Sequence, residues 1–366
     1  MPEMPLPLVG TIVKPAYKVP TLKQVAKLRA TNGYNLVSTF SGCGGSCLGF
    51  EIAGYNPLRA HEFISAAADT YRANHPGTPV DTRDIREVNT DDILTAINLR
   101  PGELDVLEGS PPCSSFSTAG NRQTDWGKVK TYSDGAQRSD DLFFEFSRLV
   151  NGLQPKVFVA ENVSGLVKGS AKGYFFEILA SLKQCGYAVE ARLLDAQWLG
   201  VPQARQRLIF VGVRNDLGLA PVFPTPNEYR YTIRDAFQNV PGAKTVEEEA
   251  PSIERFAIGR EWHRTAVGKT NSKYFQLTRT DPNKPSPTVT ATAGIAGAAG
   301  VTHFNEPRKF SIPELRRLCS FPDDFQLTGT FPQRWERLGR AVPPLMMYAV
   351  AKTIQTEILD RCANPN

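Results

Sequence analysis

Residues 35–53 read NLVSTFSGCGGSCLGFEIA and divide into three parts. Residues 35–40 form a short run typical of a buried strand, and residues 47–53 have the pattern of a helix. The three glycines between them allow a ligand to approach the backbone, where the helix N-terminus favours negative charge. This order predicts the first unit of an open α/β sheet, with a ligand site at the carboxyl ends of its strands.

The same alternation continues to about residue 215. Further strands are expected at 58–63, 104–107, 157–160, 189–194 and 207–213, and helices at 65–74, 91–99, 141–153 and 174–185. Strands that alternate with helices predict a mostly parallel, doubly wound sheet. Helical patterns return at 313–319 and 344–359.

The alternation stops where the composition changes. Residues from 221 to about 300 are rich in Pro, Gly, Thr and charge, and residues 251–284 hold seven Lys or Arg but only three acids, with Trp262, Tyr274 and Phe275 among them. Basic residues interleaved with aromatics suit a nucleic acid, although a solvated face would have the same composition. The sequence therefore predicts an N-terminal extension at 1–34, a large domain at 35–220 and 305–366, and a smaller domain at 221–304.

The composition excludes several classes of protein. Apolar residues make up 41% and charged residues 22%, as in soluble globular proteins, and no apolar run approaches the ~20 residues of a membrane span. Six cysteines and four histidines fit neither a disulfide scaffold nor a zinc pattern, so a reducing, cytosolic setting without a structural metal is expected. The net charge of +5 mildly favours a polyanionic partner.

Two acids follow the glycine loop at informative positions. A dinucleotide fingerprint would need glycine where Cys47 stands, which disfavours a nicotinamide oxidoreductase. Glu62 lies 20 residues after Gly42, at the end of the second strand, where an acid can accept both ribose hydroxyls. Asp84 follows the third strand region and could hold an adenine amino group. An adenosine ligand without a phosphate bridge is predicted; the alternative is that both acids are solvated strand ends.

Residues 108–117 read EGSPPCSSFS and place a cysteine in a preset turn. Pro111 and Pro112 fix the backbone before Cys113, and the hydroxyl residues after it leave the chain free to move. A small buried cysteine in a tight turn is the alternative interpretation. The preceding apolar run places Cys113 beyond the carboxyl end of a strand, where such sheets bind ligands.

Further motifs then follow in order: Glu-Asn-Val at 161–163, Gln-Ala-Arg-Gln-Arg at 203–207, RKFSIPELRRL at 308–318 and Gly-Arg-Ala-Val-Pro-Pro at 339–344. Together with the glycine loop and the Pro-Pro-Cys, they resemble the DNA cytosine-5 methyltransferase family over roughly residues 35–359. The resemblance implies a Rossmann-like fold that uses S-adenosylmethionine, a double-stranded DNA substrate, and a target-recognition domain at 221–304.

The resemblance also implies a chemistry for these motifs. The Cys113 thiolate would add to C6 of a flipped-out cytosine and make C5 nucleophilic toward the methyl group. Glu161 would assist at N3, and Asn162 would orient it. Arg205 and Arg207 would bind O2 or hold the carboxylate and the cysteine loop.

Two larger sets of residues are predicted. The cofactor residues are Phe40, Gly42, Gly44, Gly45, Glu62, Asp84, Ile85, Pro112, Arg340 and Val342. The DNA contacts are Ser117, Arg122, Lys128, Gln203, Arg260, Arg264, Lys273 and Arg279, of which the first three belong to a predicted lid at 114–137.

Arg340 departs from the family pattern, which usually has asparagine there. Two interpretations remain open. Arg340 could turn outward to a DNA phosphate or to Glu336. Alternatively, it could bind the extra carboxylate of carboxy-S-adenosylmethionine, so that the product would be 5-carboxymethylcytosine.

Two other functions stay open, a tRNA cytosine-5 methyltransferase of the same family and a DNA-binding module without activity. The intact Cys113, Glu161 and arginine pair disfavour the second. We expect a monomer in the cytoplasm of a bacterial or phage-infected cell, with a cognate restriction endonuclease as a possible partner and no contact with a membrane.

Overall fold

The computed structural model describes residues 14–112, 130–132, 135–137, 141–168, 171–238, 240 and 250–363, with only the backbone for 130–132 and 135–137. Cys113 and the predicted DNA contacts Ser117, Arg122 and Lys128 therefore lie outside the described residues. Within the described part, no helix is long and apolar enough to cross a membrane.

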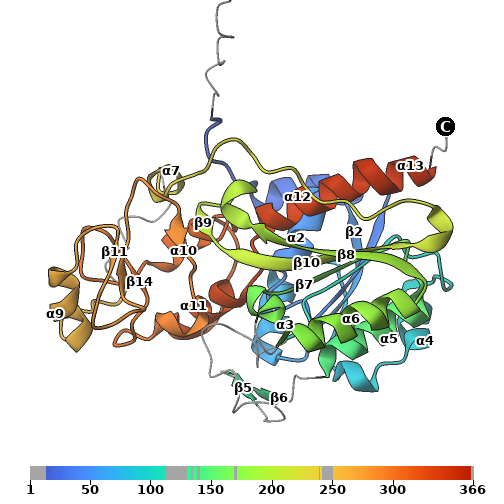
Figure 1. Cartoon of the computed structure of the whole chain (residues 1–366), viewed down its shortest axis with the longest axis horizontal. Helices are drawn as coiled ribbons and strands as arrows, with labels where there is room; N and C mark the ends of the chain where they lie inside the picture. The colour runs from blue at the N-terminus through green and yellow to red at the C-terminus, as the bar shows by residue number, and fades with distance from the viewer. Residues whose placement is uncertain are drawn as a thin grey trace, which may run out of the picture.

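A seven-stranded sheet forms the centre of the larger part of the molecule (Figure 1). Its strands lie in the order β3-β2-β1-β4-β7-β10-β8. Their bounds are β1 Asn35–Thr39, β2 Asn56–His61, β3 Val80–Asp81, β4 Val106–Gly109, β7 Val157–Val163, β8 Tyr187–Asp195 and β10 Gln206–Arg214. Only β10 runs antiparallel to its neighbours β7 and β8, so the prediction of a mostly parallel, doubly wound sheet is confirmed.

Helices cover both faces of this sheet (Figure 1). One face packs against α2 (Gly45–Ile52) and α12 (Pro344–Ile354), which contribute Cys47, Phe50, Met346 and Val350 to a buried cluster. The other face packs against helices α4 (Thr90–Ile97), α5 (Leu142–Leu153) and α6 (Lys172–Gln184). The helix α3 is Ser65–Asn74, as predicted, and α1 is Leu22–Leu28. The predicted helix at 344–359 continues from α12 through a π-helical turn at Gln355–Leu359 into α13 (Asp360–Ala363).

Short elements connect these layers. The 3-10 helices are η1 Ile85–Glu87, η3 Ser164–Val167, η5 Ala196–Trp198, η6 Asn215–Leu217 and η8 Ala291–Gly294. A two-stranded hairpin is formed by β5 (Lys130–Tyr132) and β6 (Gly135–Gln137).

The second part of the molecule contains small sheets and short helices. Strands β11 (Lys269–Thr270), β12 (Thr278–Arg279) and β14 (Val301–Thr302) form one sheet, and β13 (Ser286–Pro287) pairs with β9 (Gln203–Ala204). The helices are α7 Ile233–Ala236, α9 Ala257–Arg264, α10 Ile312–Leu318 and α11 Phe331–Arg340. Buried Val289, Ala293 and Val301 pack in one cluster with Leu315 of α10 and Trp335 of α11. The predicted division at residue 304 falls within this cluster, and the domain bounds stay a prediction.

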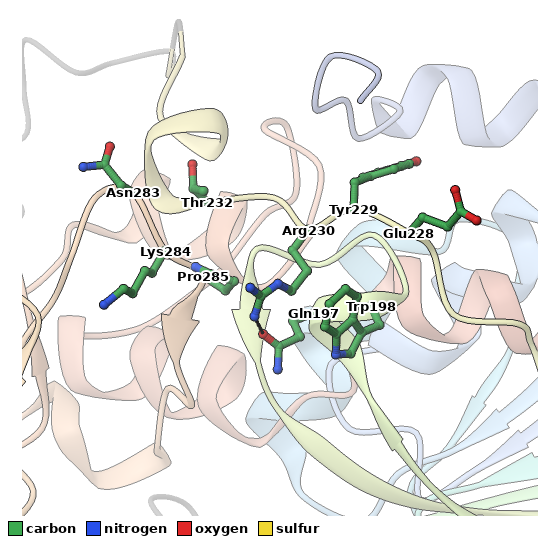
Figure 2. Close-up of a pocket in the computed structure, with 9 residues that line it drawn as sticks. All are labelled: Gln197, Trp198, Glu228, Tyr229, Arg230, Thr232, Asn283, Lys284 and Pro285. Carbon is green, nitrogen blue, oxygen red and sulfur yellow. Dashed lines mark hydrogen bonds between the residues drawn. The ribbon is translucent and has the colours of Figure 1, made fainter. Parts of the chain in front are cut away.

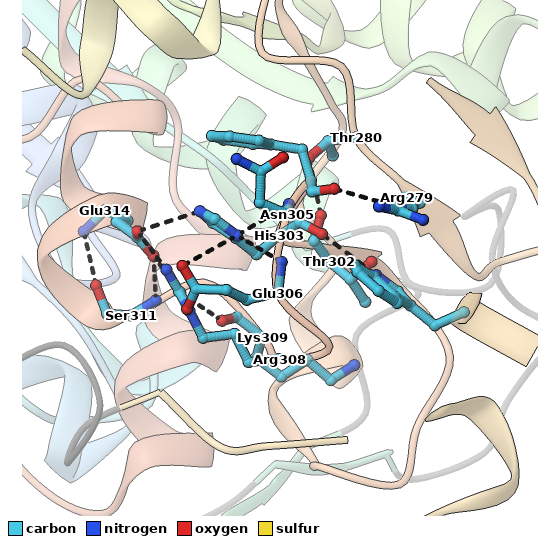
Figure 3. Close-up of polar contacts among 12 residues, drawn as sticks. Arg279, Thr280, Thr302, His303, Asn305, Glu306, Arg308, Lys309, Ser311 and Glu314 are labelled. Atoms are coloured by element: carbon cyan, nitrogen blue, oxygen red, sulfur yellow. Dashed lines mark hydrogen bonds and ion pairs between the residues drawn. The ribbon is translucent and has the colours of Figure 1, made fainter. Parts of the chain in front are cut away.

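A buried ion pair fixes the chain where it enters α10 (Figure 3). The guanidinium of Arg308 donates to both carboxylate oxygens of Glu314, at 2.8 and 3.0 Å, and its Nε also donates to Glu306 at 2.6 Å. Glu314 in turn accepts the backbone N–H of Ser311 at 2.7 Å and completes a capping box. The Arg308 and Glu314 side chains are only 9% and 8% exposed, so neither charge can be left without the other.

We expect Glu314→Ala to lower the free energy of unfolding by about 3 kcal/mol, because it leaves the Arg308 charge buried without its main partner. Glu306→Ala is the matched control, since Glu306 contacts the same guanidinium but is 52% exposed, and its loss should cost less than about 1 kcal/mol. Urea denaturation of the three proteins measures the difference. Equal effects of the two substitutions would contradict the assignment.

Candidate active site

In the glycine loop between β1 and α2, some glycines are packed against the protein and one is open. Phe40, Gly42 and Gly44 all have positive φ angles, of 51°, 55° and 90°. A Cβ atom at Gly44 would lie 2.0 Å from Nε2 of His75, and one at Gly45 would lie 2.4 Å from the carbonyl oxygen of Val342. Gly44 and Gly45 are therefore required by packing within the protein. A Cβ atom at Gly42 would meet no atom of the described residues within 4 Å, so the described part of the chain leaves the loop open at Gly42.

Glu62 lies at the end of β2 and is bonded directly to this open position. Its carboxylate accepts the backbone N–H of Gly42 at 2.7 Å and that of Ile64 at 2.7 Å. Burial raises the pKa of this carboxyl group, while the two backbone N–H groups lower it. The structure thus brings together the two residues that the sequence separates by 20 positions. The binding of a ribose by Glu62 stays a prediction.

Asp84 and Ile85 lie beyond β3, at the start of η1. The Asp84 carboxylate accepts the backbone N–H of Arg86 at 3.1 Å and pairs with the Arg86 guanidinium at 3.0 Å. Ile85 is 5% exposed and belongs to a buried cluster. Asp84 is thus held beside the carboxyl ends of the strands, and its contact with an adenine stays a prediction.

Glu161, Arg205 and Arg207 meet at the end of β7. Gly109 of β4 pairs with Ala160, so the turn that leads to Cys113 leaves the sheet beside Glu161. Nε of Arg207 lies 2.5 Å from the Glu161 carboxylate, and these side chains are 14% and 11% exposed. Burial raises the pKa of Glu161, and the charges of Arg207 and Arg205 lower it.

Arg205 is buried and joins three parts of the chain. Its guanidinium donates to the carbonyl oxygens of Val289 and Arg340, each at 3.2 Å. Burial lowers the pKa of Arg205 to about 9. Among the described residues, its buried Nε has no hydrogen-bond partner. Arg205 therefore holds the backbone at Val289 and Arg340 against the segment before β10.

Asn162 contacts the turn that leads to Cys113. Its Nδ2 donates to the carbonyl oxygen of Pro111 at 3.1 Å, and its Oδ1 accepts the backbone N–H of Val163 at 2.8 Å. That Asn162 orients Glu161 stays a prediction. Asn162 ties the end of β7 to the Pro111–Pro112 turn, one residue before Cys113.

The sequence analysis missed Glu108, although it quoted this residue in the cysteine motif. Glu108 lies on β4 and is 2% exposed. Its carboxyl oxygens accept hydrogen bonds from the hydroxyls of Ser38 and Ser46. Burial raises its pKa to about 7, and the nearby Glu161 charge adds to this effect. The sequence does contain a signal for this residue, because Glu108 is an acid inside an apolar strand and comes just before the cysteine turn.

The prediction that Gln203 contacts DNA is wrong. Gln203 is fully buried, and its Nε2 donates to the Leu318 carbonyl oxygen at 3.3 Å. Its Oε1 accepts the backbone N–H of Val289 at 3.2 Å. This amide connects β9, α10 and the segment after β13, so it has no surface for a ligand.

The other predicted DNA contacts of the second part differ in their surroundings. The Arg279 guanidinium lies 3.9 Å from the centre of the Trp262 ring and donates to the carbonyl oxygens of Phe304 and Thr265, which argues against a DNA contact. Arg260, Arg264 and Lys273 are exposed. These three side chains stay predicted DNA contacts.

Arg340 points toward an acid on its own helix. Its Nε lies 2.8 Å from the carboxylate of Glu336, one turn earlier on α11, and its side chain is 49% exposed. The structure therefore shows the outward pairing with Glu336 that was one of the two open interpretations. Val342, two residues later, is buried and presents its carbonyl oxygen to Gly45.

A cavity of about 610 Å³ lies away from these residues (Figure 2). Arg230 crosses it, with its guanidinium 4.7 Å from the centre of the Trp198 ring and 3.1 Å from the Gln197 side-chain oxygen. The other lining residues are Glu228, Tyr229, Thr232, Asn283, Lys284 and Pro285. None of the predicted cofactor or catalytic residues lines this cavity, so we do not assign it to the reaction.

Comparison with known proteins gives consistent matches. The family model described as C-5 cytosine-specific DNA methylase matches residues 34–356. The chain is 33% identical over 336 residues to the Type II methyltransferase M1.HphI of Haemophilus parahaemolyticus, covering 87% of this chain and 86% of the relative. It is 32% identical over 355 residues to the Type II methyltransferase M.NgoFVII of Neisseria gonorrhoeae, covering 91% and 89%.

Two solved structures share the fold. One is a DNA modification methyltransferase encoded within a prophage of E. coli, at 22% identity and a TM-score of 0.72, covering 89% of this chain and 99% of that chain. The other is a DNMT2 variant of Spodoptera frugiperda, at 17% identity and a TM-score of 0.63, covering 86% and 97%. The Rossmann-like methyltransferase fold predicted from the sequence is therefore confirmed.

Proposed function

Because the chain belongs to the C-5 cytosine-specific DNA methylase family and is a DNA cytosine-5 methyltransferase, we propose that Cys113 and Glu161 carry its reaction. The observation that supports this most is the meeting of β4 and β7 at their carboxyl ends. There Glu161 pairs with Arg207, and Asn162 holds Pro111, two residues before Cys113. A nucleophile on this turn would act beside a buried acid with two arginines.

The residues fit an S-adenosylmethionine site. Gly42 leaves the loop open, and the Glu62 carboxylate is fixed beside it without a phosphate-binding glycine pattern. We propose that Phe40, Gly42, Glu62 and Asp84 hold the cofactor. S-adenosylmethionine supplies a methyl group that is electrophilic because it is bonded to a sulfonium.

The steps then balance as follows. The Cys113 thiolate forms a bond to C6, and the displaced electrons reach N3, which takes a proton from Glu161. S-adenosylmethionine held beside Gly42 and Glu62 would supply the methyl group to C5, and its carbon–sulfur bond would break as the new bond forms. Water takes the C5 proton, the thiolate leaves with the electrons of its bond to C6, and the double bond between C5 and C6 is restored. The proton at N3 returns to Glu161. Arg207 and Arg205 favour the carboxylate that Glu161 becomes after the first transfer.

A product assay tests this function. The purified chain is incubated with methyl-labelled S-adenosylmethionine and either duplex DNA or tRNA, and the nucleosides are analysed by mass spectrometry. We expect label in 5-methylcytosine of DNA. Label in tRNA alone would instead establish a tRNA methyltransferase, and DNA binding without label would establish an inactive DNA-binding module.

We infer that the transferred group is methyl, because Arg340 is paired with Glu336 and its side chain is half exposed. Arg340→Asn should therefore keep DNA methylation within about threefold of the wild-type rate, since the ion pair with Glu336 that it breaks is half exposed. Parallel reactions with carboxy-S-adenosylmethionine measure the competing product. A 5-carboxymethylcytosine mass that Arg340→Asn abolishes would overturn this inference, and loss of all activity would assign Arg340 to DNA or to structure.

We further propose that residues 221–304 read the target site, with exposed Arg260, Arg264 and Lys273 on DNA phosphates. The two relatives compared above are named Type II methyltransferases. By analogy, this chain would act as a monomer in the cytoplasm of a bacterial or phage-infected cell and protect a site from a cognate restriction endonuclease.

A further inference from the structure

Glu108 lies near the end of β4, shortly before the turn that leads to Cys113, and its carboxyl group is bonded to β1 and α2. One oxygen accepts the hydroxyl of Ser38 on β1, and the other accepts the hydroxyl of Ser46, in the first turn of α2, at 2.7 Å. The Ser38 hydroxyl is also 2.7 Å from the hydroxyl of Ser41 in the glycine loop. A single side chain therefore joins β1, the glycine loop and α2 to the end of β4.

Nothing basic balances this carboxyl group within the described part of the chain, where it forms no ion pair. The titratable groups that face it are the Glu161 carboxyl on β7, the Cys47 thiol on α2 and the Tyr71 phenol on α3. None of these groups is a cation. A buried carboxylate with two hydroxyl donors and no counter-charge is unfavourable. A cation that binds beside Glu108 would therefore be attracted to the ionised carboxylate and would stabilise it.

The proposed reaction places a cation in this region. The sulfonium must lie within reach of both the cofactor loop, which includes Gly42, and the base bound at Cys113, and Glu108 connects these two segments. After transfer, the product carries a neutral thioether. A negative charge at this point would therefore stabilise the cofactor more than the product, and it would help the product to leave.

We propose that Glu108 is a positioning residue that ties the glycine loop to the cysteine turn, and that its negative charge favours S-adenosylmethionine over S-adenosylhomocysteine. This inference rests on the proposed binding of S-adenosylmethionine at the glycine loop. It concerns the relative affinity for the two ligands, whereas the proposed function concerns the transfer itself.

The sign of the pH dependence follows from the environment of the carboxyl group. In the free protein its pKa is raised to about 7, and a bound cation lowers it again. Binding of S-adenosylmethionine thus releases a proton below about pH 7, and its affinity falls as the pH falls. The neutral product lacks this dependence.

Isothermal titration calorimetry with the full chain and each of the two ligands, from about pH 6 to about pH 8, tests this proposal. We expect the ratio of the affinity for S-adenosylmethionine to that for S-adenosylhomocysteine to rise with pH in the wild-type chain. Glu108→Gln should lower this ratio by about tenfold and make it independent of the Glu108 titration. The amino groups of the ligands titrate in the same way with the wild-type chain and with Glu108→Gln. The difference in the pH dependence of binding between these two proteins therefore reports Glu108 alone. Two buffers of different ionisation enthalpy report the released proton.

Ser46→Ala is the matched control, because it removes one hydrogen bond to Glu108 and keeps the carboxyl group. That hydrogen bond lowers the pKa of Glu108, so its loss should move the growth of the preference for S-adenosylmethionine to higher pH without abolishing it. If Glu108→Gln does not fold, Glu108→Asp keeps the charge and should keep the ratio. The proposal would be overturned if Glu108→Gln left the ratio of affinities unchanged, or if Glu108→Asp lost it. A wild-type ratio that does not vary with pH would overturn it as well. A wild-type chain that binds neither ligand would instead overturn the proposed cofactor site.

Discussion

DNA methylation is expected to fall by at least about 10⁴-fold when Cys113 is replaced by serine, while binding of S-adenosylmethionine stays unchanged. A thiolate is accessible near neutral pH, whereas a serine hydroxyl is almost fully protonated there and cannot add to C6 at a useful rate. The turn that carries this position is held by Asn162 through the Pro111 carbonyl oxygen, and Cys113→Ser leaves that contact in place. The loss should therefore appear in the chemical step and not in folding.

Single-turnover transfer of labelled methyl groups measures this loss, and covalent trapping identifies its cause. With S-adenosylmethionine and duplex DNA that contains 5-fluorocytosine, C5 carries fluorine in place of the proton that must leave, so the bond from the thiol to C6 persists after methyl transfer. The wild-type chain should form a DNA adduct that resists denaturation, and Cys113→Ser should form none. Cys185→Ser is the control, since this half-buried thiol lies on the far end of α6 and should not alter the adduct. A normal rate in Cys113→Ser would refute the proposed nucleophile.

The sequence was sufficient for the parts of the site that local spacing determines. A strand followed by a glycine loop and a helix fixes where a loop leaves the sheet, and the carboxyl ends of neighbouring parallel strands meet at one edge. For this reason the separation of 20 residues between Gly42 and Glu62 became a contact of 2.7 Å between their polar atoms. The same logic brought Glu161 beside the turn that leads to Cys113.

Features that depend on tertiary packing were not accessible in this way. Nothing in the local pattern of residues 206–214 indicates that β10 runs antiparallel to β7 and β8. Gln203 looks like a polar surface residue in sequence, but the side chain is buried because two backbone groups, from Val289 and Leu318, converge on its amide. Asn162 follows Glu161 in the chain, yet adjacent residues of a strand point to opposite faces, and its amide reaches Pro111.

Glu161→Gln is expected to lower kcat by about 10³-fold, because the amide cannot give a proton to N3 when electrons arrive there. The substitution keeps the size of the side chain and a hydrogen-bond acceptor for Arg207, whose Nε lies 2.5 Å from the carboxylate. Affinity for DNA and for S-adenosylmethionine should consequently change little. A loss confined to kcat would separate proton donation from a structural role.

The pH dependence provides an independent measure of the same group. Burial raises the pKa of Glu161, so the protonated donor persists to a higher pH than in an exposed glutamate, and the rate should fall as the pH rises through that raised pKa. Ionisation of Cys113 has the opposite effect, and together they give a bell-shaped profile of kcat. Glu161→Gln should remove the falling limb and keep the rising one.

Glu190→Gln on strand β8 is the matched control, because this carboxylate is 49% exposed, pairs with Arg192 and should leave both limbs in place. If Glu161→Gln kept the full rate with both limbs, N3 would have to receive its proton from another group. Arg207 could not be that group, because a guanidinium does not give up its proton near neutral pH. The proton donor would then be a group other than Glu161 and Arg207.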